Sequence, residues 1–209
     1  MTLEANLAPE PERRRSAAVA GHRHDEATAR SLLHDPAPAV RSIALGALHR
    51  SGVLRSDDLR SAIADGDPSV RSRAAELVAA LAGTGPAEDV SLLDLLDDPD
   101  DTVVETAAWA SGERTEAEPG VVERLSALAT GAEDALVREA AVAALGAIGD
   151  PAGLPAVLAA TTDKATVRRR AVIALAPFEG PEVDAALANA LEDRDWQVRQ
   201  AAEDLAGPD

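Results

Sequence analysis

A short pattern of apolar residues recurs six times along this 209-residue chain, and it constrains the fold more than any other feature. Each copy places a valine four residues before an alanine, and in most copies an arginine directly follows the valine. The pairs are Val40 and Ala44, Val70 and Ala74, Val103 and Ala107, Val137 and Ala141, Val167 and Ala171, and Val198 and Ala202. Successive valines lie 30 to 34 residues apart. A period of this length predicts a repeat protein.

The spacing within each copy predicts an amphipathic helix. Four residues after the alanine, the first five copies place Leu48, Val78, Ser111, Leu145 and Leu175. Offsets of zero, four and eight residues lie on one helical face. A second start signal follows, either an Asp-Pro or a Gly-Pro pair, as at Asp150 and Gly180. Each repeat is therefore a helical hairpin, whose apolar face is buried only when neighbouring hairpins stack on it.

An aspartate stands five positions before the valine in four copies, at Asp35, Asp65, Asp98 and Asp193, whereas Ala132 and Thr162 replace it in two others. Because proline follows Asp35 and Asp98, we interpret these two residues as helix N-caps. The aspartates recur together with the arginine that follows the valine. We expect the two to bridge adjacent repeats as a structural ladder. The ladder arginines are Arg41, Arg71, Arg138, Arg168 and Arg199.

The composition favours closely packed helices. Hydrophobic residues make up 46% of the chain, but Phe178, Trp109 and Trp196 are the only aromatics. Alanine has a high helix propensity and lets helix backbones approach, whereas β-sandwiches favour β-branched and aromatic residues. The sequence therefore predicts an all-α fold, an α-solenoid of about six helical hairpins followed by a C-terminal capping helix.

The segment EDALVREAAVAALGAIGDPAGLPAVLAA, residues 133–160, resembles HEAT-like repeats of the type found in phycobilisome lyases. Residues 98–113, DPDDTVVETAAWASGE, are similar to the first helix of the same unit, and the resemblance extends over about residues 35–205. Where such repeats carry Arg and Leu, this chain has Val104 and Ser111, so we expect looser packing there. The resemblance implies that the second helices line a concave surface, which would display Asp94, Arg124, Ala156, Ala159, Asp184 and Asn189.

The repeats are expected near residues 35–64, 65–97, 98–131, 132–161 and 162–191, with a terminal helix at 192–207. We expect a degenerate N-terminal hairpin at residues 12–34 and a disordered tail at residues 1–11. Trp196 is expected to help cover the end of the array, because terminal repeats of solenoids differ from the internal ones.

The charge is strongly negative and unevenly distributed. The chain has a net charge of −17, and residues 88–118 hold eleven acidic residues but one basic residue, Arg114. Two interpretations stay open: this band steers a partner that has a basic patch, or it is a solvated segment that keeps the protein soluble. On the first interpretation the binding residues include Glu88, Asp89, Asp94, Asp97, Asp98, Asp100 and Asp101. The acidity disfavours nucleic acid as a partner, because phosphate binding needs a basic surface.

The sequence contains few of the signals that mark catalysis or metal binding. It has no cysteine, and its histidines, His22, His24, His34 and His49, form no His-Glu pair. No nucleophile motif, phosphate-binding loop or dinucleotide-binding motif is present. We therefore expect no catalytic residue, no cofactor and no metal. No signal peptide or membrane-spanning stretch is recognisable, so we expect a cytoplasmic protein without a membrane partner.

These observations favour a non-catalytic protein–protein interaction scaffold that binds its partner on the solenoid surface. The resemblance keeps an alternative open, a bilin-lyase-like or other HEAT-repeat enzyme or chaperone subunit. A DNA-repair glycosylase also uses such repeats, but the acidity and the scarcity of aromatic residues disfavour it.

Overall fold

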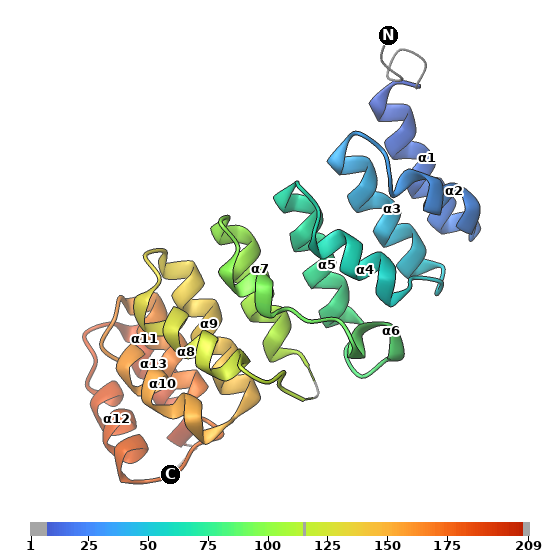
Figure 1. Ribbon diagram of the computed structural model, residues 1–209. Coiled ribbons are helices and arrows are strands. Elements are labelled where there is room, and N and C mark those ends of the chain that lie inside the picture. The colour runs from blue at the N-terminus through green and yellow to red at the C-terminus, as the bar shows by residue number, and fades with distance from the viewer. Residues whose placement is uncertain (1–7, 115, 207–209) are drawn as a thin grey trace. The chain divides into compact units, whose positions relative to one another are not determined.

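The computed structural model describes residues 8–114 and 116–206, which are helical with connecting turns and contain no β-strand (Figure 1). The chain divides into two compact units, Met1–Val90 and Ser91–Asp209, which we call unit 1 and unit 2. No helix in the described part of the chain has the length and hydrophobicity needed to span a lipid bilayer.

Unit 1 stacks helical hairpins in two layers. Helices α1, α3 and α5 pack side by side and form its A layer, whereas α2 and α4 form its B layer. In the third hairpin, which begins with α5, the second helix starts with only a single helical turn, α6. The bounds are α1 Glu10–Arg23, α2 Glu26–Leu32, α3 Pro38–Arg50, α4 Ser56–Ile63, α5 Pro68–Ala80 and α6 Gly85–Glu88.

Unit 2 continues the same alternation. Its A layer consists of α7, α9, α11 and α13, and its B layer consists of η2, α8, α10 and α12. The bounds are η2 Leu93–Asp97, α7 Asp101–Gly112, α8 Val121–Gly131, α9 Ala135–Ile148, η3 Pro151–Gly153, α10 Leu154–Ala160, α11 Ala165–Ala174, α12 Pro181–Leu191 and α13 Trp196–Ala206. The predicted all-α solenoid of helical hairpins is therefore confirmed.

The repeated valines and alanines are buried core residues of the A-layer helices in both units. All six alanines of the pattern are at most 1% exposed, and all six valines are at most 2% exposed. Ser111 is also buried, and its hydroxyl donates a hydrogen bond of 2.8 Å to the carbonyl oxygen of Ala107 one turn earlier. The hydroxyl is therefore satisfied within its own helix, although serine stands where other repeats place leucine or valine.

Small side chains let neighbouring A-layer helices approach closely. A Cβ atom built on Gly146 of α9 would lie 2.6 Å from the Cα atom of Ala174 in α11. A Cβ atom on Gly112 of α7 would lie 2.9 Å from the Cα atom of Ala144 in α9. No larger residue fits these positions without moving a backbone, which explains why the repeats need so many small residues.

The helix starts differ in one respect from the sequence interpretation. Asp35 and Asp98 are not N-caps, because the caps of α3 and α7 are Ala37 and Asp100. The carboxylates of Asp35 and Asp98 instead accept backbone hydrogen bonds from Ala37 and Asp100, each 2.9 Å long. A residue before proline is pushed toward extended backbone, so the helix begins only after the turn that these aspartates stabilise.

The ends of the chain differ from the predicted boundaries. Most of the predicted N-terminal tail, residues 1–7, lies outside the described residues, and α1 already begins at Glu10. Helices α1 and α2 occupy the segment predicted as a degenerate hairpin. Trp196, expected to cover the end of the array, is 64% exposed at the start of α13.

We predict that Ala141→Asp destabilises unit 2, because Ala141 is fully buried and an unpaired carboxylate there loses its hydration. The expected loss of unfolding free energy exceeds about 2 kcal/mol. Thermal unfolding followed by circular dichroism measures it, with Ala147→Asp at an exposed position of the same helix as the matched control. Equal stability of the two variants would contradict the burial.

Candidate protein-binding surfaces

The recurring arginines bridge adjacent repeats. The Arg41 guanidinium contacts Asp65 of the next repeat at 2.6 Å, Arg138 contacts Asp163 at 2.6 Å, and Arg168 contacts Asp193 at 2.8 Å. In each case two guanidinium nitrogens donate to the two carboxylate oxygens. Such bidentate pairs are directional and strong. The predicted structural ladder is thus confirmed, and these arginines are occupied within the chain.

Each ladder arginine also binds the turn that precedes its own helix. The third guanidinium nitrogen of Arg138 donates to the backbone carbonyl oxygen of Ala132 at 2.8 Å. The third guanidinium nitrogen of Arg168 donates to the backbone carbonyl oxygen of Asp163 at 2.8 Å. Arg199 makes the same contact with the carbonyl oxygen of Asp193 at 2.6 Å. The ladder therefore fixes the turns between the B and A layers as well as the spacing of repeats.

The ladder explains the exceptions in the sequence pattern. Val104 replaces the arginine in α7, and the position that this arginine would bridge to is Ala132, so both partners are missing from the same interface. Thr162 is no real exception, because Asp163 takes the role one residue later. A further ion pair joins Arg13 to Asp35 at 2.6 Å. The sequence pattern does not predict it, because α1 has no valine–alanine pair.

The ladder carboxylates have perturbed acidities. The hydrogen bond from Arg168 holds the pKa of Asp193 below its usual value, although partial burial opposes the shift. Arg138 lowers the pKa of Asp163 in the same way. These shifts come from structural ion pairs, so they indicate no catalytic group.

The histidines do not form a metal site. Within the described residues no group of three or more His, Asp or Glu side chains has the arrangement to hold a metal ion. Burial lowers the pKa of His49, and the nearby Arg73 and Arg50 add to this effect. His49 is therefore held toward its neutral form inside unit 1.

The predicted acidic band is divided between the two units. Glu88 and Asp89 are exposed residues of unit 1, whereas the remaining acids belong to unit 2. Asp94 and Asp101 are exposed, and Asp97 is exposed but forms an ion pair with Arg124. Asp98 and Asp100 are half-buried and accept hydrogen bonds from the backbone. Part of this band therefore stabilises turns.

The residues expected on the surface of the second helices differ in their exposure to solvent. Ala159, Asp184 and Asn189 are exposed on the B layer, and Arg124 is half-buried against the carbonyl oxygen of Leu96. Ala156 is only 6% exposed, so its placement on a binding surface is wrong. Ala156 is buried in α10 together with Val157 and Ala160.

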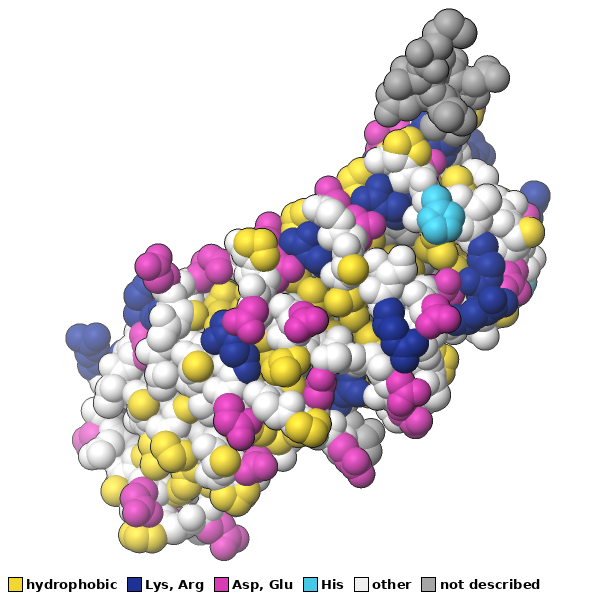
Figure 2. Space-filling model, in the orientation of Figure 1, with side chains coloured by type: hydrophobic (Ala, Val, Ile, Leu, Met, Phe, Trp, Pro, Cys, Tyr) yellow, Lys and Arg dark blue, Asp and Glu magenta, His cyan; other side chains and the backbone are white. Residues whose placement is uncertain are grey.

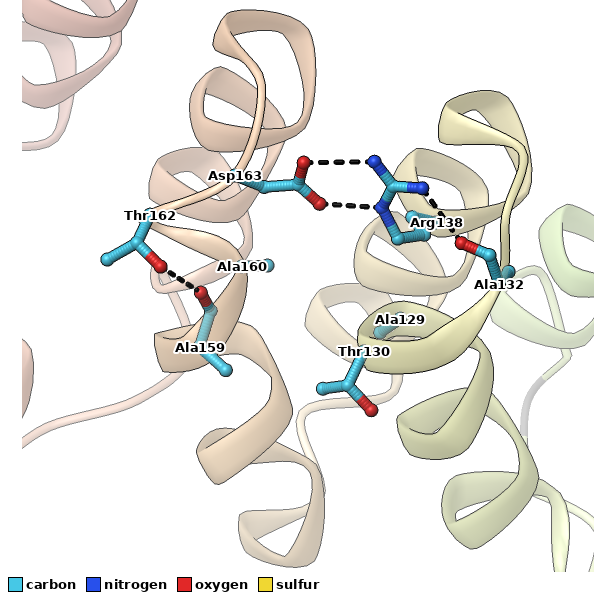
Figure 3. A pocket seen from close by; sticks show the side chains of 8 residues that line it. All are labelled: Ala129, Thr130, Ala132, Arg138, Ala159, Ala160, Thr162 and Asp163. Atoms are coloured by element: carbon cyan, nitrogen blue, oxygen red, sulfur yellow. Dashed lines mark hydrogen bonds and ion pairs between the residues drawn. The ribbon is translucent and has the colours of Figure 1, made fainter.

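An open hollow of about 350 Å³ lies where the C-terminal ends of α8 and α10 come together (Figure 3). The ladder pair of Arg138 and Asp163 forms one side of it. The hydroxyl of Thr162 donates to the carbonyl oxygen of Ala159 at 2.9 Å. The remaining lining residues are Ala129, Thr130, Ala132 and Ala160. Alanine and threonine side chains therefore make up most of the lining.

The two units differ sharply in charge. Unit 1 has 13 acidic and 11 basic residues, a net charge of −2, whereas unit 2 has 24 acidic and nine basic residues, a net charge of −15. Figure 2 shows acidic side chains spread over the visible face of unit 2, with hydrophobic side chains between them. A partner of positive charge is therefore attracted chiefly to unit 2.

The sequence matches the HEAT-repeat family over residues 26–112, 90–176 and 122–206, which together span most of the chain. The chain belongs to the HEAT-repeat family. This match supports HEAT repeats in general and does not specifically support the phycobilisome-lyase type. A comparison with curated proteins finds no match.

This HEAT-repeat protein is similar in fold to several solved structures. YIBA_ECOLI is 19% identical with a TM-score of 0.63, and 96% of this chain aligns with 75% of that one. An engineered protein is 21% identical with the same TM-score, over 85% of this chain and 93% of its own. A designed armadillo repeat protein in complex with the peptide (KR)4 is 17% identical with a TM-score of 0.58, over 95% and 98% of the two chains.

We predict that Asp193→Asn lowers the unfolding free energy of unit 2 by about 1.5–3 kcal/mol near neutral pH, because it removes the charged acceptor of Arg168. The folded-state pKa of Asp193 is depressed, so its contribution is present above the unfolded-state pKa of about 3.9 and is lost as the pH falls through the folded-state value. Chemical denaturation at neutral and acidic pH measures both. A stability difference that stays constant in acid would contradict the ion pair.

Proposed function

We propose that this HEAT-repeat protein is a non-catalytic scaffold that binds a basic, extended segment of a protein partner along the B layer of unit 2. The observation that carries the proposal is the combination of a net charge of −15 with a hollow at helix C-termini that is lined by small side chains. HEAT-type arrays present extended surfaces that suit protein binding.

Acidic side chains that are free of ion pairs within the described residues lie in the first turns of B-layer helices of unit 2. Asp94 lies on η2, Glu123 on α8, and Glu182 and Asp184 on α12, and all four are exposed. None of the four forms an ion pair within the described chain. These carboxylates remain available to lysine or arginine side chains of a partner, unlike the aspartates of the ladder.

The hollow supplies a place for the backbone of the bound segment. Alanine and threonine side chains leave room for a peptide chain between α8 and α10. The C-terminal ends of two helices carry partial negative charge, which favours N–H donors and cations. A bound segment that runs along the B layer from the hollow to the first turns of the B-layer helices would bring its basic side chains to the exposed acids.

The structural comparison supports this mode of binding by analogy. The designed armadillo repeat protein shares the helical-repeat fold of this chain and was solved with the basic peptide (KR)4. In that complex a helical-repeat array holds a basic peptide, and the charge of unit 2 supports the same preference here.

Fluorescence polarisation with labelled (KR)4 tests the charge preference, with labelled (DE)4 as the opposite-charge control. We expect binding of (KR)4 that weakens steeply with added salt, and no binding of (DE)4. Equal behaviour of the two peptides, or no binding at low salt, would contradict the proposal.

A charge-matched pair of variants locates the site. Asp94→Asn, Glu123→Gln and Asp184→Asn combined should weaken (KR)4 binding about tenfold, because exposed ion pairs each contribute about 0.5 kcal/mol. The control combines Glu113→Gln, Glu179→Gln and Glu203→Gln, which remove the same charge at exposed positions outside the B-layer helices. If both triple variants lose the same affinity, the peptide senses only the overall charge and the proposed site is wrong.

Filling the hollow tests the role of the backbone contact. Ala159→Arg places a long cationic side chain at an exposed position of the hollow, so (KR)4 affinity should fall at least about tenfold while thermal stability stays unchanged. Ala206→Arg, at the exposed end of α13, adds the same charge elsewhere in unit 2. Similar affinities of the two variants would show that the hollow is not occupied.

A further inference from the structure

The A layer of unit 2 exposes large hydrophobic side chains on the side away from the core. Within the described residues the exposed large hydrophobics are Trp109, Leu136, Ile173, Leu191 and Trp196, and all of them belong to unit 2. All except Leu191 lie on A-layer helices. Clustered exposure of this kind marks interaction surfaces more often than chance scatter does.

The repeat register places two of these side chains, Trp109 and Ile173, at the same position of their repeats. Trp109, Ala143 and Ile173 each stand six residues after the buried valine of their helix. A residue at this offset lies on the side of the helix that faces away from the valine. Because α9 packs between α7 and α11, the three side chains cross adjacent helices on the outer face of the A layer.

The central helix of this face is almost uncharged. The outer side of α9 carries Leu136, Ala140, Ala143 and Ala147. Its single charged residue there, Glu139, already contacts Arg170 of α11 at 3.4 Å. Small side chains on α9 let another helix approach closely.

A groove of about 440 Å³ extends the face toward α13. Ile173 and Arg169 of α11 lie on one side, and Trp196 and Leu205 of α13 lie on the other. The groove is large enough for an aromatic side chain, and its lining also includes the polar side chains of Gln197, Gln200 and Asp204.

The charges on the two edges of this face have opposite sign. Glu105 on α7 and Arg169 on α11 occupy the same repeat position, two residues after the valine. Neither forms an ion pair within the described residues. Together with Glu139 and Arg170, these charges on α7, α9 and α11 sum to zero, whereas the groove at α13 adds the carboxylate of Asp204 and unit 2 as a whole is at −15.

We propose that a second copy of this chain docks on this face, with a twofold axis that runs parallel to α9 between the two copies. An isologous interface uses the same patch on both copies, so a patch with an acidic edge and a basic edge becomes complementary to itself after rotation by 180°. The rotation brings α7 of each copy opposite α11 of the other. Glu105 then meets Arg169, and the Trp109 ring meets the same guanidinium beside the groove. Opposite charges therefore meet across this face although each copy of unit 2 is strongly acidic as a whole.

Sedimentation velocity over a range of protein concentrations tests the dimer. We expect the unaltered protein to dimerise and Ala143→Arg to be monomeric, because the arginine would place two like charges beside the twofold axis. Ala127→Arg, at an exposed position of α8 in the B layer, is the matched control and should dimerise normally. A monomeric unaltered protein at every concentration would overturn the proposal.

Charge reversal tests the twofold geometry even if Ala143→Arg fails to fold. Glu105→Arg alone and Arg169→Glu alone should each weaken self-association about tenfold or more, because each sets two like-charged pairs across the interface. An equimolar mixture of the two variants should restore association as a heterodimer in which both pairs are again of opposite sign. Failure of the mixture to associate more tightly than either variant would rule out this arrangement.

Tryptophan fluorescence identifies the face that is used. In Trp196→Phe the only remaining tryptophan is Trp109, which is 45% exposed in the single chain. Its emission should shift to shorter wavelength as the dimer forms. Dimer formation without such a shift would place the interface elsewhere and contradict the proposal.

Discussion

The structure depends on close packing between neighbouring A-layer helices, and the closest approaches between them depend on glycine and alanine. The repeated valines and alanines are almost completely buried, and Gly146 meets the backbone of Ala174 so closely that even a methyl group does not fit. Each buried methyl or methylene group contributes about 0.8 kcal/mol, so the stability comes from many small contacts. The arginine–aspartate ladder adds direction to this packing because it fixes the turns between successive repeats.

The arginine–aspartate ladder determines which charged residues are structural and which remain available to a partner. Arginines and aspartates in the recurring positions hold repeats together, so they are not free to bind a partner. The remaining carboxylates, such as Asp94 and Asp184, project from the B layer without an ion pair. The outer face of the A layer carries exposed Trp109 and balanced charge. One repeat pattern thus produces two chemically different surfaces on unit 2.

Much of the fold follows from the sequence because a period near 30 residues and a valine–alanine spacing of four leave few alternatives. Local turn geometry was harder to predict: Asp35 and Asp98 stabilise the turn before the helix, and only the backbone shows that the cap comes later. Burial of Ala156 and exposure of Trp196 also depended on how helices rotate against their neighbours, which composition does not encode. The hollow near Asp163 joins residues from two repeats and has no signature within either one.

The second half of the third hairpin is the exception to the regular packing. Gly83 has a φ of 74°, and Gly85 and Pro86 follow it, so the segment forms only the single turn of α6 and the 3-10 turn of η2. Hydrogen–deuterium exchange of the intact protein tests most directly whether small-residue packing holds the array together. If this packing holds the array together, amides of α9 and α11 should exchange slowest and together, and amides of α6 and η2 should exchange fastest. Amides of α9 that exchange as fast as those of α6 would contradict it.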